Sequence, residues 1–70
     1  MDEQQTFVEE GVLFVVDKED DGKFVADIAL QKGVPVNLVE PENWARVVGR
    51  FDSLGDAITA AKYEISRMVG

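Results

Sequence analysis

The chain has 70 residues and a net charge of −7, and its length allows one small domain. It contains no cysteine and no histidine, which excludes disulfides, cysteine-based zinc sites and every catalytic pair that depends on histidine. No apolar run approaches the length of a membrane span, and the acidic start is unlike that of a signal peptide. We therefore expect one cytoplasmic domain over residues 1–70, with no cofactor and no membrane association.

The negative charge is concentrated in the first third of the chain. Residues 1–22 carry eight carboxylates against Lys18 alone, whereas residues 43–70 carry four basic side chains against three acids. A field of this sign repels phosphate backbones and anionic membranes and attracts basic proteins. The same charge also serves the solubility of a small domain, and this alternative stays open.

The first predicted elements form a β-hairpin. Residues 1–6 are expected to be a frayed start. The β-branched and aromatic residues from Phe7 to Asp17 predict a strand, with Gly11 as a bulge or late start. The residues from Lys23 to Leu30 alternate, and one face of this strand should carry Phe24, Ala26, Ile28 and Leu30. The segment Asp20–Gly22 predicts the turn, because Asp-Gly tolerates the positive φ that hairpins need.

The second half of the chain predicts one more strand and a helix. Residues 31–43 contain two prolines, and Val34–Val39 within them is either a short edge strand or an extended loop. Trp44–Phe51 alternates as a strand, and Ser53 is placed to cap a helix. The apolar stripe of this helix comprises Leu54, Ala57, Ile58, Ala61, Ile65 and Met68. The predicted fold class is α+β, a small antiparallel sheet of three to four strands with one C-terminal helix on one face.

The acidic turn resembles the start of a calcium loop, with carboxylates at Asp17, Glu19 and Asp21 and a glycine at the sixth position. The twelfth position, which should hold a bidentate glutamate, is Ile28. A hairpin turn is therefore favoured and no metal site is predicted. The carboxylates lie in a turn and at a terminus, and Ser53 has no base beside it, so we expect no enzyme activity.

The sheet face turned away from the helix is predicted to be uncovered, because the chain has no second helix. An apolar patch of this kind marks an interface. The residues expected on it are Leu13, Val15, Val25, Ala29, Trp44, Arg46, Val48 and Arg50. Tryptophan and arginine also stack on the bases of single-stranded nucleic acid, although the net charge opposes that use. The alternative is a tryptophan folded over the sheet, with arginine stems lying across it.

Two stretches, residues 12–28 and 49–65, resemble HicB-like proteins. The first matches their opening hairpin with its acidic, glycine-containing turn, and the second matches their capped closing helix with its Ala-Ile and Ala-Lys pairs. Ala29-Leu-Gln-Lys-Gly-Val-Pro stands in place of the family's central Pro-Asp-Leu-Pro-Gly signature, and no C-terminal DNA-binding segment is expected after Gly70. The resemblance implies a three-stranded antiparallel sheet with a helix on one face, and an antitoxin that binds and blocks a small RNA-cleaving toxin.

These features predict a small acidic, non-catalytic protein-binding module of bacterial or phage type. Its partner is expected to be a basic protein, either a toxin or another nucleic-acid-handling enzyme that it inhibits. The predicted partner-binding residues are Glu19, Asp20, Asp21, Leu13, Val15, Val25, Trp44, Arg46, Val48 and Arg50. One alternative is a structural homodimer that pairs its open sheet faces. The other is a single-stranded nucleic-acid binder that uses Trp44, Arg46 and Arg50.

Overall fold

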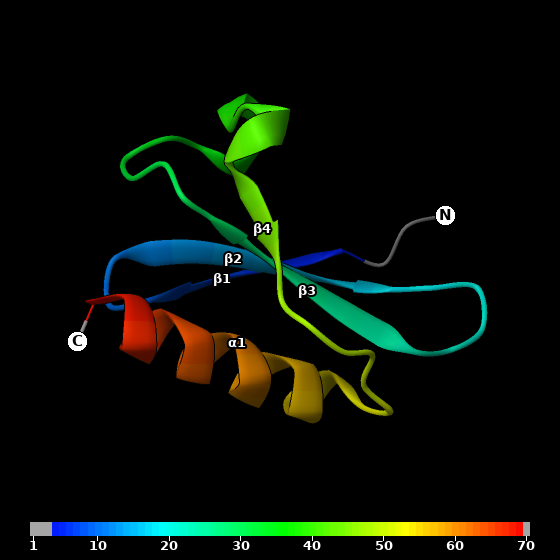
Figure 1. The fold of residues 1–70 in the computed structure, drawn as a ribbon. Coiled ribbons are helices and arrows are strands. Elements are labelled where there is room, and N and C mark those ends of the chain that lie inside the picture. Colours follow the sequence, from blue (N-terminus) through cyan, green and yellow to red (C-terminus); the bar gives the residue numbers. More distant parts are fainter. Residues whose placement is uncertain (1–3, 70) are drawn as a thin grey trace.

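The computed structural model describes residues 4–69 of the chain. They contain four antiparallel strands and one C-terminal helix (Figure 1). The strands lie in the order β1-β2-β3-β4. The elements are β1 (Gln5–Glu9), β2 (Val12–Lys18), β3 (Phe24–Ala29), β4 (Trp44–Arg46) and α1 (Leu54–Val69), with two 3-10 helices, η1 (Val36–Leu38) and η2 (Pro41–Asn43), before β4. The predicted α+β class is confirmed. The expectation of a frayed start is wrong at Gln5 and Thr6, which pair with β2 as part of β1, and its residues 1–3 lie outside the described residues.

The start of the chain differs from its prediction. The expected single strand from Phe7 to Asp17 is two strands, β1 and β2, and β1 already begins at Gln5. A two-residue turn joins them and places Phe7 opposite Phe14. Both turn residues have positive φ, 51° at Glu10 and 78° at Gly11, which is the backbone of a type I′ hairpin turn. The sequence Glu-Gly is a weaker signal for this turn than Asn-Gly or Asp-Gly, and the β-branched run around it suggested one long strand.

The second hairpin agrees with its prediction. In its turn the Gly22 N–H donates to the Glu19 carbonyl at 2.9 Å, and the Lys23 N–H donates to Asp21 Oδ1 at 3.0 Å. The register places Phe14 of β2 opposite Ile28 of β3. Because β3 ends at Ala29, Leu30 does not share the inward face as predicted and is exposed.

Helix α1 packs on the sheet face formed by alternate residues of the strands. Its start is capped as predicted, since Ser53 Oγ accepts a hydrogen bond from the Asp56 N–H at 3.1 Å. The fully buried helix residues are Ala57, Ala61 and Ile65. Their buried neighbours in the core are Val12, Phe14, Val16, Ala26, Ile28 and Val47. Leu54 and Ile58 of the predicted stripe are only partly buried, and Met68 is exposed at the far end of the helix.

Residues 31–43, called the overhang here, lie on the other side of the sheet from α1 (Figure 1). A hydrogen bond from the N–H of Leu30, the residue before the overhang, to the carbonyl of Asn43, its last residue, closes its base at 2.7 Å. Within it, Val36–Leu38 is a 3-10 helix, so the prediction of an edge strand or extended loop over Val34–Val39 is wrong at these residues. Pro35 lies at the N-cap of that helix, where its carbonyl accepts from the Leu38 N–H.

The strand predicted over Trp44–Phe51 is interrupted by a bulge. β4 pairs Arg46 with Asp27, and an unbroken ladder would then place Gly49 opposite Phe24. Phe51 lies there instead, bonded in both directions to Phe24 at 2.7 and 2.8 Å. The extra residues bulge out at Gly49, whose φ of 115° a larger residue rarely adopts. Val47, which bonds to Ala26 before the bulge, faces the core as predicted, whereas Val48 in the bulge is 94% exposed.

The packing of α1 gives the first prediction. Ile65→Ala should lower the free energy of unfolding by about 2–5 kcal/mol, because it leaves a cavity in a fully buried site. Met68→Ala on the same helix is the control, and its exposed side chain should cost less than about 0.5 kcal/mol. Urea denaturation followed by circular dichroism measures both. Equal losses in the two variants would contradict the packing described here.

Candidate functional site

The ten predicted partner-binding residues fall into three separate places. Glu19, Asp20 and Asp21 lie in the β2–β3 turn, where Arg50 joins them. Leu13, Val15, Val25, Trp44 and Arg46 belong to the sheet face opposite α1. Val48 lies in the bulge, where with Tyr63 it lines a hollow against the outer side of α1. The expectation that Arg46, Val48 and Arg50 share one face with Trp44 is therefore wrong for Val48 and Arg50.

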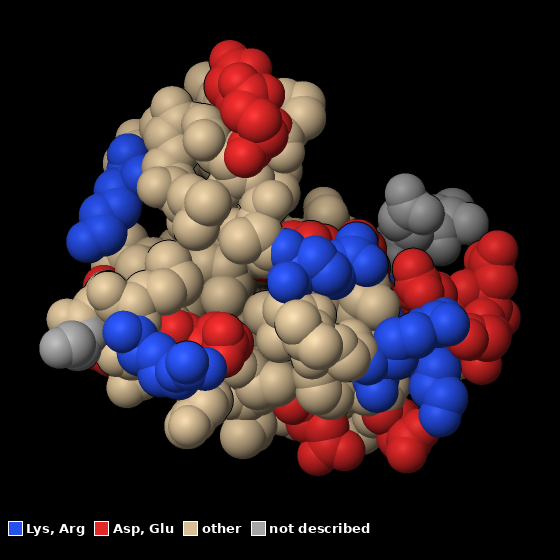
Figure 2. Space-filling model, viewed as in Figure 1, with Lys and Arg blue, Asp and Glu red and all other residues tan. Residues whose placement is uncertain are grey.

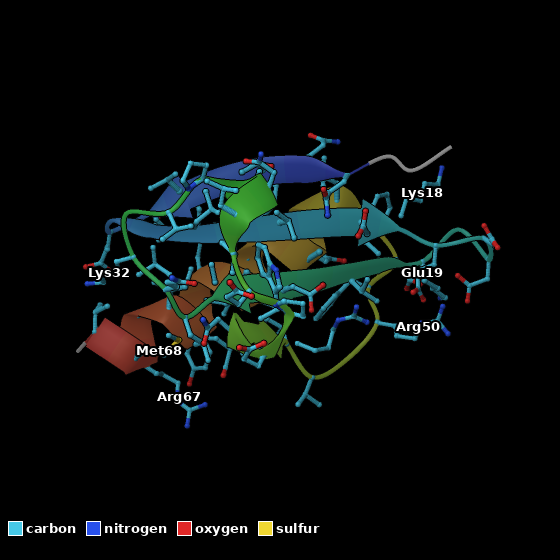
Figure 3. The ribbon with its side chains drawn as sticks, turned by 90° about the horizontal axis from the view of Figure 1, so that it is seen from above. Lys18, Glu19, Lys32, Arg50, Arg67 and Met68 are labelled. Atoms are coloured by element: carbon cyan, nitrogen blue, oxygen red, sulfur yellow. The ribbon has the colours of Figure 1, made fainter. Side chains whose placement is uncertain are left out.

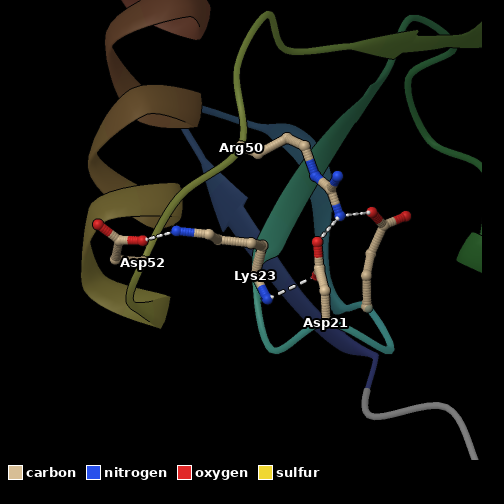
Figure 4. A network of polar contacts seen from close by, with 5 residues as sticks. Asp21, Lys23, Arg50 and Asp52 are labelled. Carbon is tan, nitrogen blue, oxygen red and sulfur yellow. Dashed lines mark hydrogen bonds and ion pairs between the residues drawn. The ribbon is translucent and has the colours of Figure 1, made fainter.

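Residues 17–22, called the acidic turn here, are braced by Arg50. Its Nη2 donates to Glu19 Oε1 and to Asp21 Oδ2, each at 2.6 Å (Figure 4). Figure 3 shows Glu19 and Arg50 close together at this end of the sheet. Because the bulge after Val47 breaks the alternation of the strand, Arg50 leaves the sheet face and its side chain extends to the acidic turn. Glu19 and Asp21 are thus paired with a cation within the chain, although their side chains remain 41% and 48% exposed to solvent.

A second ion pair fixes the base of the same hairpin. Lys23 Nζ pairs with Asp52, the residue before the helix cap (Figure 4). The hydrogen bond from Lys23, together with its positive charge, lowers the pKa of the Asp52 carboxyl. Lys23 and Arg50 thereby link the acidic turn to the segment that leads into α1.

Negative charge remains in excess at this end of the molecule. Asp20 makes no ion pair with another described residue, and the turn with Arg50 lines an open hollow of about 490 Å³. Figure 2 shows carboxylates together with Lys and Arg side chains at the end where Figure 1 places the β2–β3 turn. Within residues 4–69 no group of three or more acidic side chains is arranged to hold a metal ion. The arrangement suits contact with a cationic surface.

The sheet face opposite α1 is not uncovered, contrary to the prediction. Val15, Val25 and Ala29 are only 2%, 3% and 2% exposed, although all three point away from the helix. The overhang and the side chains of β4 shield this face instead of a second helix. Val15 and Val25 are therefore part of the packed interior, and Leu13 is partly buried.

A hollow of about 430 Å³ remains between this face and the overhang. It is lined by Gln4, Val15, Asp27, Val36, Asn37, Trp44 and Arg46. Arg46 Nε donates to Asp27 Oδ1 at 2.7 Å, and this hydrogen bond raises the pKa of Arg46 despite partial desolvation. Trp44 is half-buried beside the pair. Arg46 and Asp27 are opposite each other in the β3–β4 register, so the charge of this arginine is matched within the chain.

Sequence reasoning did not identify the surface around Tyr63. Tyr63 is 65% exposed on α1, with the Arg67 guanidinium 5.9 Å from its ring centroid. Together with Val48 it forms an apolar surface flanked by Glu64 and Arg67. The sequence feature that could have indicated this surface is Tyr63 itself, an aromatic residue on the polar side of an amphipathic helix.

The chain matches no family model, no curated protein and no solved structure. Within residues 4–69, no helix combines the length and the apolar character needed to cross a membrane.

The Lys23–Asp52 pair predicts a pH dependence. A carboxyl whose pKa is lowered by folding favours the folded state above its ordinary pKa of 3.8, and this contribution disappears as pH falls through the lower folded-state pKa. Wild type should therefore melt slightly higher than Asp52→Asn at neutral pH, and the two should converge in strong acid. Thermal melts across this pH range measure the difference. Glu42→Gln, an exposed residue outside any described ion pair, is the charge-matched control, and a gap for Asp52→Asn that is constant with pH would contradict the assignment.

Proposed function

We propose that this protein is a small, non-catalytic binding module that engages a basic protein through its acidic turn. One observation carries the proposal. Five of the seven basic side chains in the chain are held in internal ion pairs, namely Lys23, Arg46, Arg50, Lys62 and Arg67. The acids that make no ion pair with a described residue, Asp20 among them, therefore dominate the field that an approaching molecule meets.

A basic nucleic-acid-handling protein is the partner class that this field suits. Enzymes that bind RNA or DNA present a cationic surface to phosphates, and a preformed carboxylate cluster competes for that surface. The resemblance of residues 12–28 and 49–65 to HicB-like antitoxins supports a small RNA-cleaving toxin as the target. The same proposal includes a phage-type inhibitor, whose target would be another basic nucleic-acid-handling enzyme. The hairpin and the C-terminal helix of the resemblance are present, but the sheet has four strands rather than the three that the resemblance implies.

The nucleic-acid alternative has less support. It requires Arg46 and Arg50 to meet phosphates beside Trp44, but each guanidinium already bonds to a carboxylate at 2.6–2.7 Å. Arg50 also lies at the acidic turn rather than beside Trp44. Releasing either arginine would leave an unpaired carboxylate next to the incoming phosphate, which opposes binding.

The proposal that open sheet faces pair in a homodimer also has less support. That interface needs an exposed apolar surface on the face opposite α1, and Val15, Val25 and Ala29 are buried there within one chain. What remains exposed on this side is mixed in character, as in the hollow beside Trp44.

Asp20 provides the sharpest test, because its removal changes the field of the acidic turn without breaking the Arg50 cluster. The probe is a small basic RNA-cleaving toxin of the kind that HicB-like antitoxins block. Asp20→Asn should slow association with it by about two- to threefold at low salt, with little change in dissociation. Stopped-flow or surface plasmon resonance measurements over a salt series give both rates.

The matched control is Glu42→Gln, which removes the same charge from the overhang, away from the turn. It should slow association less than Asp20→Asn does. Equal effects would indicate that only net charge matters and would contradict binding at the turn. A single-stranded RNA oligomer is the counter-probe, and tight RNA binding by wild type at physiological salt would overturn the proposal.

A further inference from the structure

Strand β1 lies at one edge of the sheet. Its outer side pairs with no described strand and is well suited to bind β1 of a second copy. In the order β1-β2-β3-β4 the two edges are β1 and β4. β4 has three residues and follows directly on the overhang. β1 has five residues, Gln-Thr-Phe-Val-Glu, with no proline, lysine or bulge to prevent edge pairing, and its one charged residue, Glu9, is paired with Lys62 of α1.

The β1–β2 turn determines which backbone groups point outward from β1. A two-residue turn makes Glu9 and Val12 a hydrogen-bonded pair, and such pairs alternate along an antiparallel ladder. Gln5, Phe7 and Glu9 therefore direct their N–H and carbonyl groups toward β2. Thr6 and Val8 direct theirs toward the free edge.

We propose that β1 pairs antiparallel with β1 of a second copy, with Phe7 on the two-fold axis. Only in this register do all five residues of the two strands overlap. The same register brings the outward groups of Thr6 opposite those of Val8 in the other copy, so each finds a partner. Two four-stranded sheets join in this way into one continuous sheet of eight strands.

The side chains suit this register. Gln5 faces Glu9 of the other copy, so no two like charges among residues 5–9 are opposed. Phe7 is half-buried and stacks on Phe14 with ring centroids 5.3 Å apart. Pairing brings the two copies of Phe7 together and covers the edge side of each ring, as it also covers part of Val8, which is 64% exposed.

This inference does not rest on the proposed function, because the acidic turn takes no part in the pairing. The two β2–β3 turns lie beyond the Gln5 ends of the two β1 strands, and antiparallel pairing sends those ends in opposite directions. Both acidic turns remain accessible, and their mutual repulsion is small. Failure of dimerisation would therefore leave the binding proposal unaffected.

Thr6→Pro tests the interface, since proline at this position removes an outward N–H and keeps the bonds to β2. Sedimentation equilibrium over a concentration series reaching the millimolar range should show a wild-type dimer. Thr6→Pro should raise its dissociation constant by about tenfold or more, because each dimer loses two backbone hydrogen bonds. Thr6→Val keeps the N–H and is the matched control. Circular dichroism verifies that each variant is folded.

Cross-linking tests the register independently. Because the chain has no native cysteine, every disulfide formed must join the introduced cysteines. An equimolar mixture of Gln5→Cys and Glu9→Cys should oxidise mainly to the mixed disulfide, because these residues face each other as a close pair. Intact mass spectrometry separates it from the two homodisulfides. A monomeric wild type, a dimer that folded Thr6→Pro leaves intact, or a statistical mixture of disulfides would each overturn the proposal.

Discussion

A single helix has to cover the core face of a four-stranded sheet, and two alanines make close packing possible. Ala57 and Ala61 are fully buried, so the backbone of α1 approaches the strands closely while Ile65 and Phe14 fill the space between them. Phe7, Phe24 and Phe51 surround this contact as partly buried residues. Because α1 covers only one face, the remaining chain has to shield the other.

That second requirement explains the least regular parts of the molecule. The overhang lies over the face opposite α1, and the Arg46–Asp27 pair lines the hollow between them. The bulge after Val47 then lets the chain return to β3 at Phe51 and reach the helix cap. The same bulge separates Arg50 from Arg46 and sends it to the acidic turn. One backbone irregularity thus decides how the arginine charges are matched.

The features predicted correctly from sequence are those that depend on short spacings. The Asp-Gly turn, the alternation of β3, the Ser53 cap and the burial of Ile65 all follow from neighbours within about one turn or one strand. The β1–β2 turn was missed because it needs positive φ at Glu10, which a glutamate rarely adopts. The bulge was missed because Trp44–Phe51 alternates without interruption, and only the pairing of Phe24 with Phe51 reveals the shift. For the same reason the acidic turn was placed correctly, but the ion pairs that Arg50, 31 residues beyond Glu19, makes with it were not foreseen.

Ionic strength separates the two associations that we propose, because they respond to it with opposite signs. Two copies with a net charge of −7 repel each other, so salt should strengthen the pairing of β1 edges by screening this repulsion. A basic partner at the acidic turn is attracted, so salt should weaken that complex. Since the pairing leaves both turns free at opposite ends of the joined sheet, a dimer could carry two partners at once. The acidic turn then recognises a charged surface, and the β1 edge doubles the number of such turns in one complex; the two parts of the fold share no residue.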